Sequence, residues 1–153
     1  MNTVGNACPV AILLFLALCI GCNSGEYKLV PVSGTVTLDG EPVSNARVIF
    51  EPRRVDPSSL TAGPSSDGET DESGKFSLAT TADGKSGAIA GTHDVVVTTY
   101  LAEIDRETDS HKVVRKEQIP QRYLEPGGLT FEIPADGTDA ADLMLTTSPS
   151  KNP

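Results

Sequence analysis

The chain has 153 residues, which is enough for one domain and too few for two well-packed ones. Its formal net charge of −9 gives a surface that is repelled by nucleic acid and by anionic lipid headgroups, so nucleic acid is not an expected partner. All three cysteines (Cys8, Cys19 and Cys22) lie in the first 22 residues. Disulfides, a cysteine metal site and a catalytic thiol are therefore excluded from the rest of the chain.

The first 21 residues carry no charged side chain, and Val10–Ile20 is an unbroken apolar run of 11 residues. A membrane-spanning helix needs about 20 such residues, whereas the apolar core of a secretory signal peptide needs about 7–15. The run therefore predicts a signal peptide over residues 1–21, although Met1–Pro9 has no Lys or Arg. A buried helix is the alternative, and the strand patterns that fill the rest of the chain argue against it.

A cysteine follows this run directly, preceded by Ile20 and Gly21, and a short polar segment comes after it. The arrangement resembles the lipobox of bacterial lipoproteins, with Cys19 where that family usually has Leu. The resemblance implies cleavage between Gly21 and Cys22, lipidation of Cys22 by diacylglyceryl and fatty-acyl groups, and a tether over residues 22–29. An ordinary cleaved signal or an uncleaved anchor is the alternative.

Downstream of the leader, apolar and hydroxyl residues alternate from Val32 to Leu38, which is the period of a half-buried strand. Asp39-Gly40 is typical of a two-residue type I′ turn, because both central residues must tolerate positive φ. A second strand is expected to return beside the first. Its predicted apolar face consists of Ala46, Val48 and Phe50.

Two further features concern the start of that predicted second strand. Pro42 lacks an amide hydrogen, so it belongs at the first residue of a strand or at a sheet edge. The apolar parity changes between Val43 and Ala46, which predicts a one-residue bulge at Ser44-Asn45.

Further strand patterns follow, separated by turn residues. Phe76 and Leu78 are expected to point inward from one strand, and Val95–Val97 to lie in a central strand that is packed on both faces. Pro52–Asp67 is interpreted as a long loop, and the charged segment Leu101–Glu117 as an extended loop or a ragged hairpin extension. Two more strands are expected at residues 129–133 and 143–145. Together these segments predict an all-β, seven-stranded sandwich over residues 30–147, with a frayed tail at 148–153.

Several short motifs occur in a fixed order along this region. They are G-x-V (Gly34, Val36), T-D-x-x-G-x-F (Thr70, Asp71, Gly74, Phe76), a G-x-H-x-V-x-V strand (Gly91, His93, Val95, Val97) and P-x-x-Y (Pro120, Tyr123). This order resembles the carboxypeptidase-regulatory-like (transthyretin-like) domain of bacterial envelope lipoproteins, with His93 where that family has an aromatic residue. The resemblance implies a transthyretin-like or immunoglobulin-like sandwich. It does not imply an activity, since such domains are mostly accessory.

The two histidines of the chain, His93 and His111, could with Tyr100 and Tyr123 supply an iron site of the kind found in sandwich-fold intradiol dioxygenases. That family has a closely spaced His pair, whereas these two are 18 positions apart, so structural roles are expected.

Four acidic residues surround a glycine turn, an arrangement that a hard cation such as Ca²⁺ favours. They are Asp67, Glu69, Asp71 and Glu72. Their spacing does not fit a twelve-residue Ca²⁺ loop, so we interpret them as solvated turn residues. We expect no catalytic centre, no metal site and no cofactor in this chain.

These observations predict a membrane-anchored, non-catalytic sandwich lipoprotein with an interaction or structural role in the bacterial cell envelope. Its expected partners are the membrane, through the lipid on Cys22, and an envelope protein or polysaccharide. Two alternatives remain: a Ca²⁺-dependent or carbohydrate- or peptide-binding accessory module, or an enzyme whose site is built from the loops Arg53–Asp67 and Leu101–Glu117.

Overall fold

The computed structural model describes residues 27–54, 62–105 and 110–148. The predicted signal peptide and the cleavage and lipidation site at Gly21 and Cys22 lie outside these residues, as do positions 55–61 of the predicted long loop. The described elements are β1 (Leu29–Val30), β2 (Ser33–Leu38), β3 (Glu41–Pro42), β4 (Arg47–Pro52), β5 (Ser66–Glu69), β6 (Lys75–Ser77), β7 (Ala79–Thr80), β8 (Ala88–Ile89), β9 (Gly91–Thr98), β10 (Leu101–Asp105), β11 (Ser110–Arg115), the 3-10 turn η2 (Gln121–Tyr123), β12 (Thr130–Ile133) and β13 (Leu143–Leu145).

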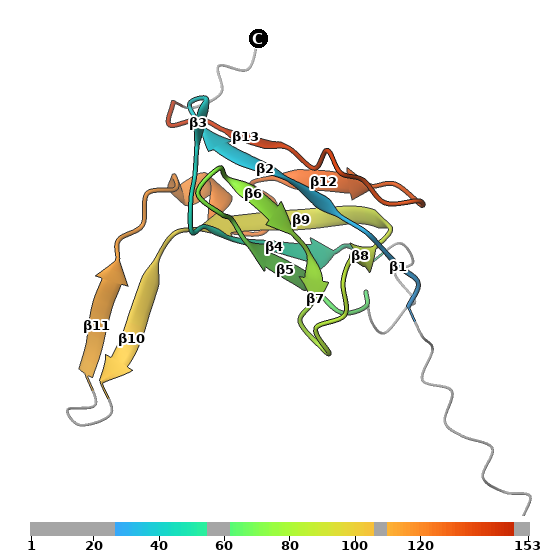
Figure 1. Cartoon of the computed structure of the whole chain (residues 1–153), viewed down its shortest axis with the longest axis horizontal. Coiled ribbons are helices and arrows are strands. Elements are labelled where there is room, and N and C mark those ends of the chain that lie inside the picture. The colour runs from blue at the N-terminus through green and yellow to red at the C-terminus, as the bar shows by residue number, and fades with distance from the viewer. Residues whose placement is uncertain (1–26, 55–61, 106–109, 149–153) are drawn as a thin grey trace, which may run out of the picture.

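Two main sheets face each other across one apolar core in a sandwich-like arrangement (Figure 1). One has the strand order β12-β9-β4-β5-β7, and the other has the order β13-β2-β3, with β6 also paired to β2. The prediction of an all-β fold is confirmed. The described part of the chain contains thirteen strand segments where seven were expected, because short segments such as β3 and β4, or β6 and β7, belong to different sheets.

The turn between β2 and β3 has the predicted geometry, with φ of 53° at Asp39 and 90° at Gly40. The expectation that a long second strand returns beside β2 is wrong, because β3 pairs with β2 through only two residues, Glu41 and Pro42. A turn at Ser44-Asn45, with Asn45 at φ 54°, then carries the chain across to the other sheet. The parity change before β4 is therefore a change of sheet and not a bulge. Asparagine tolerates this left-handed conformation better than most residues do.

The predicted inward faces are confirmed at Val36 of β2, at Val48 and Phe50 of β4, and at Val95 and Val97 of β9, which are all inaccessible. Leu38 at the end of β2 is only partly buried. Phe50 lies at the centre of the core, with ring centroids 6.3 Å from Phe76, 5.8 Å from His93 and 5.8 Å from Phe131. The expectation that β9 is packed on both faces is wrong. Val96 is only half-buried, because it points to the outer face of its sheet, opposite Ile49 of β4.

The last strand, β13, pairs in parallel with β2, and Leu143 lies opposite Val36. This close approach depends on Gly34, because a Cβ atom at that position would lie 2.2 Å from the carbonyl oxygen of Ala141. Past β13, the Asp39 carboxylate accepts hydrogen bonds from Thr147 N at 3.0 Å and Thr147 Oγ1 at 2.7 Å. The β2–β3 turn therefore holds the C-terminal segment against the sandwich.

Candidate interaction surface

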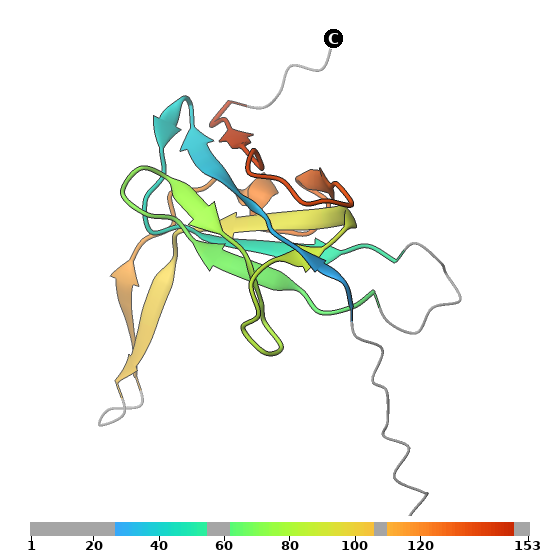
Figure 2. The ribbon, with the colours of Figure 1, turned by 45° about the vertical axis from the view of Figure 1, so that its right-hand side comes forward.

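The charged segment after β9 forms a two-stranded antiparallel hairpin, β10–β11, which confirms the second of the two interpretations made for it. The hairpin projects away from the two sheets in both views of the ribbon (Figures 1 and 2). Neither strand packs extensively against another described element. The register is irregular between Leu101 and Ala102, because Val114 has no partner on β10.

Paired residues in an antiparallel ribbon share a face, so the hairpin has one mostly apolar face and one mostly charged face, and the charged face also includes Leu101 opposite Arg115. Ala102 pairs with Val113 and Ile104 pairs with His111, which gives the apolar face. The opposite face includes the charge-complementary pair Glu103 and Lys112. We define the four residues Ala102, Ile104, His111 and Val113 as the apolar hairpin face.

Exposed apolar side chains are concentrated here. Of the seven large hydrophobic side chains that are exposed in the described residues, five lie on the hairpin or at the residue before it. These five are Tyr100, Leu101, Ile104, Val113 and Val114. Ile104 is 61% exposed, far more than an isoleucine on the inner face of a sheet would be.

Glu117 fixes the root of the hairpin to the end of β9. Its carboxylate accepts hydrogen bonds from Thr98 Oγ1 at 2.5 Å, Thr99 N at 3.0 Å and Thr99 Oγ1 at 2.8 Å. It also accepts from the main-chain N–H groups of Gln118 and Ile119, both at 2.9 Å. Partial burial alone would raise the pKa of the Glu117 carboxyl, but these hydrogen bonds outweigh it and lower the pKa to about 2.

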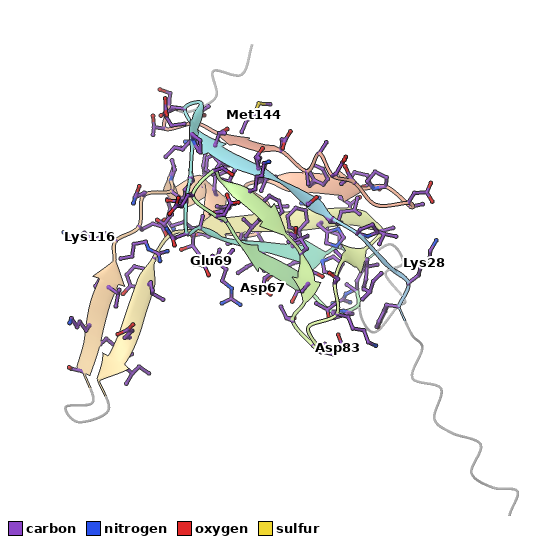
Figure 3. All side chains as sticks on the ribbon, viewed as in Figure 1. Lys28, Asp67, Glu69, Asp83, Lys116 and Met144 are labelled. Carbon is purple, nitrogen blue, oxygen red and sulfur yellow. The ribbon has the colours of Figure 1, made fainter. Side chains whose placement is uncertain are left out.

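A second contact joins the same root to the body of the sandwich. The Arg115 guanidinium donates a hydrogen bond to the main-chain oxygen of Asn45, in the turn where the chain changes sheets. Figure 3 shows Lys116 beside this root, and Met144 on the side of the molecule away from the hairpin. The hairpin is therefore anchored at its base, while its faces are left open.

The four acidic residues around the predicted glycine turn are not brought together as a cation site. Asp67 forms an ion pair with Arg47 at 2.7 Å. Asp71 closes its own turn, because it accepts hydrogen bonds from Ser73 N, Ser73 Oγ and Lys75 N. A polar hollow of about 370 Å³ lies beside β2 and β6, with Glu69 and Asp71 on its wall. Within the described ranges, no group of three or more His, Cys, Asp or Glu side chains is placed to hold a metal ion.

The four residues considered for an iron site lie in separate environments. His93 is buried in the core, where Nδ1 donates to the carbonyl oxygen of Gly91 at 2.9 Å, and burial lowers its pKa. His111 is exposed on the hairpin, and Tyr100 is exposed at its start. The hydroxyl oxygen of Tyr123 accepts a hydrogen bond from Thr146 N at 3.3 Å. His93 thus occupies, against Phe50, the core position expected of an aromatic residue.

Comparisons with known proteins give little further guidance. No family model matches the chain, and no curated protein matches it. Among solved structures, a 9R-lipoxygenase from Cyanothece PCC8801 is similar at 12% sequence identity and a TM-score of 0.37. The match covers 77% of this chain and only 16% of the lipoxygenase chain. A likeness this low carries no argument about fold or activity.

In residues 27–54, 62–105 and 110–148, no helix has the length and apolar character that crossing a bilayer requires.

Proposed function

We propose that the chain is a lipid-anchored, non-catalytic sandwich module of the bacterial cell envelope, and that it binds its partner through the hairpin β10–β11. The observation that carries this proposal is the concentration of exposed apolar side chains on a projecting ribbon whose base is fixed by Glu117. Exposed apolar patches on folded domains mark interaction sites more often than they mark random surface.

The proposed family is the transthyretin-like sandwich, and its seven strands would be those of three or more residues in the two main sheets: β2, β4, β5, β6, β9, β12 and β13. Several motif residues occupy positions that support it. Gly34 permits the contact with Ala141, Phe76 is buried against Phe50, and Thr70 Oγ1 accepts a hydrogen bond from Ala46 N at 2.8 Å. These residues therefore have structural reasons to be the types they are.

The non-catalytic part of the proposal is supported by the structural roles of the acidic and basic side chains that could otherwise serve in catalysis. His93 fills the core, Glu117 fixes the hairpin, and Asp142 accepts hydrogen bonds from Thr35 N at 3.0 Å and Thr35 Oγ1 at 2.5 Å. Each of these groups forms packing contacts or hydrogen bonds that hold the fold together, which is the structural role proposed for them.

Membrane attachment is proposed through Cys22, and Cys22→Ala tests it. Each buried CH₂ of an acyl chain contributes about 0.8 kcal/mol, so two or three chains anchor a protein stably where one does not. We expect the variant to leave the membrane fraction after processing or to remain as an uncleaved precursor. Fractionation, with mass spectrometry of the native N-terminus, measures this. An unmodified Cys22 in the native protein, or cleavage at another position, would contradict the proposal.

Partner binding through the hairpin is tested by affinity capture from detergent-solubilised envelope. The full chain is compared with Ile104→Asp, which places a charge on the apolar hairpin face, and with Met144→Asp as the matched control. Met144 is 81% exposed on β13, so both substitutions add one charge to an exposed strand. We expect the captured complex to be lost in Ile104→Asp and retained in Met144→Asp. Equal capture of the complex by the two variants would contradict the proposal that the partner binds through the hairpin.

A further inference from the structure

We propose that the end of the sandwich around Tyr27 is a membrane-contact surface, on which the domain stands with its hairpin at the far end. The partner of this surface is the phosphate-bearing headgroup layer of the membrane that holds the chain. The inference rests on the proposed lipid anchor at Cys22, and it adds how the folded domain is oriented. We call this surface the anchor end, and it consists of Tyr27, Lys28, Arg54, Gly63, Ile89 and Thr92.

The chain between the proposed lipid and the sandwich is short. Residues 23–26 separate Cys22 from Tyr27, the first described residue. An extended chain covers at most about 3.6 Å per residue, so Tyr27 lies within about 18 Å of the lipidated cysteine. The anchor end therefore stays close to the bilayer in every orientation that the domain adopts.

Contacts between distant parts of the chain make the anchor end one surface. Gly63 lies against two other members, because a Cβ atom at this position would meet the Tyr27 ring and the Ile89 side chain. Strand β1 pairs with β8 directly beside this contact. The main-chain N–H of Arg53 donates to the carbonyl oxygen of Thr92 at 2.8 Å, which places the end of β4 beside the start of β9. Tyr27 is therefore held on folded structure.

The exposed side chains of the anchor end suit a headgroup layer. Tyr27 is 45% exposed, and tyrosine combines an apolar ring with a polar hydroxyl, which is the combination favoured at membrane interfaces. Lys28 and Arg54 are exposed, and within residues 27–54, 62–105 and 110–148 neither has a carboxylate partner. Both cations are thus available to a lipid phosphate, which lysine and arginine bind through charge-assisted hydrogen bonds.

Charge orients the domain in the same sense. At −9, the chain as a whole is repelled by an anionic bilayer. The repulsion is smallest at the anchor end, because the basic and acidic side chains described there are equal in number. They are Lys28, Arg53, Arg54 and Lys85 against Asp83, Asp94, Glu132 and Asp136. The opposite end exposes Glu41 of β3 and Glu72 in the turn before β6, so turning that end toward the bilayer would be less favourable.

Strand β9 places the hairpin at the end of the domain away from the bilayer. It begins at Gly91 beside the anchor end, and the hairpin starts three residues after its last residue, Thr98. Eight strand residues cover about 25 Å. Figure 3 shows Lys28 and Lys116, which lies at the hairpin root, on opposite sides of the molecule. The apolar hairpin face is therefore presented to envelope proteins beyond the headgroup layer.

Quenching of a fluorescent label tests this orientation. The lipidated chain, purified from membranes, is reconstituted into vesicles of phosphatidylcholine and phosphatidylglycerol that contain a lipid spin-labelled at its headgroup. Single cysteines carry the fluorophore, since the described domain has no cysteine of its own. Thr92→Cys reports on the anchor end, and Tyr100→Cys, just past the far end of β9, is its control. Both positions are exposed, and neither substitution changes the net charge. Lys28→Cys reports on the lipid anchor itself.

We expect several-fold stronger quenching at Thr92→Cys than at Tyr100→Cys. Equal quenching at the two positions, or stronger quenching at Tyr100→Cys, would overturn the inference. Strong quenching at Lys28→Cys would in that case show that the proposed anchor still holds. Absence of quenching at Lys28→Cys would contradict the anchor and the inference together.

The cationic contact is tested in the labelled Thr92→Cys chain. Arg54→Glu replaces a cation of the anchor end and should reduce quenching toward the level seen at Tyr100→Cys. Arg47→Glu, at the opposite end of β4, is the matched control and should leave quenching unchanged. Equal quenching in these two variants would overturn the assignment of Arg54 to the membrane-contact surface.

Discussion

Phe50→Ala is expected to lower the free energy of unfolding by about 3–5 kcal/mol, which is the usual cost of removing a fully buried aromatic side chain. Phe50 is inaccessible to solvent and lies between the two sheets. Its ring approaches Phe76 of β6, which pairs with β2 in the facing sheet, and also His93 and Phe131, which lie on β9 and β12 of its own sheet. The cavity would therefore remove contacts on both sides of the core at once.

Equilibrium denaturation by urea measures this effect. Phe50→Leu retains most of the volume and should cost less than about 1.5 kcal/mol. Met144→Ala, at an 81% exposed position, should change stability by no more than about 0.5 kcal/mol. If Phe50→Ala cost no more than Phe50→Leu, the aromatic cluster would not be the centre of the core.

Glu117→Ala is expected to have the second large effect and to lower the free energy of unfolding by about 2–4 kcal/mol. Hydrogen bonds to a charged group contribute about 1.5–3 kcal/mol, and the variant leaves the donors of Thr99, which is nearly inaccessible, without their acceptor. Because the carboxylate joins the end of β9 to the chain after β11, the hairpin should also become more open to hydrogen exchange. Glu103→Ala, an exposed acidic residue on the same hairpin, is the matched control and should have little effect.

The pH dependence of stability distinguishes a charge-dependent role of Glu117 from a purely steric one. The folded pKa of Glu117 is about 2, below its ordinary value of 4.5, so the carboxylate stabilises the fold fully above pH 4.5. That contribution is lost as the pH falls toward 2. The stability difference between the native chain and Glu117→Ala should consequently shrink over this range. A difference that stays constant from pH 7 to pH 2 would exclude the charge as its source.

Local patterns in the sequence predict the inward faces well, because burial on one side of a strand repeats every second residue. Val36, Phe50, Phe76 and Leu143 all point inward as their parity requires. The sheet to which each strand belongs is harder to predict from the sequence, because tertiary packing determines which strands pair. Asn45 illustrates this: the parity change beside it is compatible with a bulge or with a change of sheet, and only the partners of β4 distinguish the two.

The hairpin and its root were only partly predictable. Ala102–Asp105 alternates apolar and acidic residues, which is a strand signal that the density of charge around it obscures. Glu117 looks like any other acidic residue of that segment. Its partners at Thr98 and Thr99 lie 19 and 18 positions away, across the whole hairpin, so no local pattern identifies it.

The parallel pairing of β2 with β13 has a consequence for how the chain is made. Val36 is among the first residues of the domain to be synthesised and Leu143 among the last, yet the two lie side by side. Contacts between such distant positions form late, because a long loop must close before they contribute. A chain that emerges N-terminus first, from a ribosome or from a translocation channel, cannot complete the β2 sheet until β13 has emerged. For the proposed exported lipoprotein, this order would delay completion of the β2 sheet until β13 has crossed the membrane.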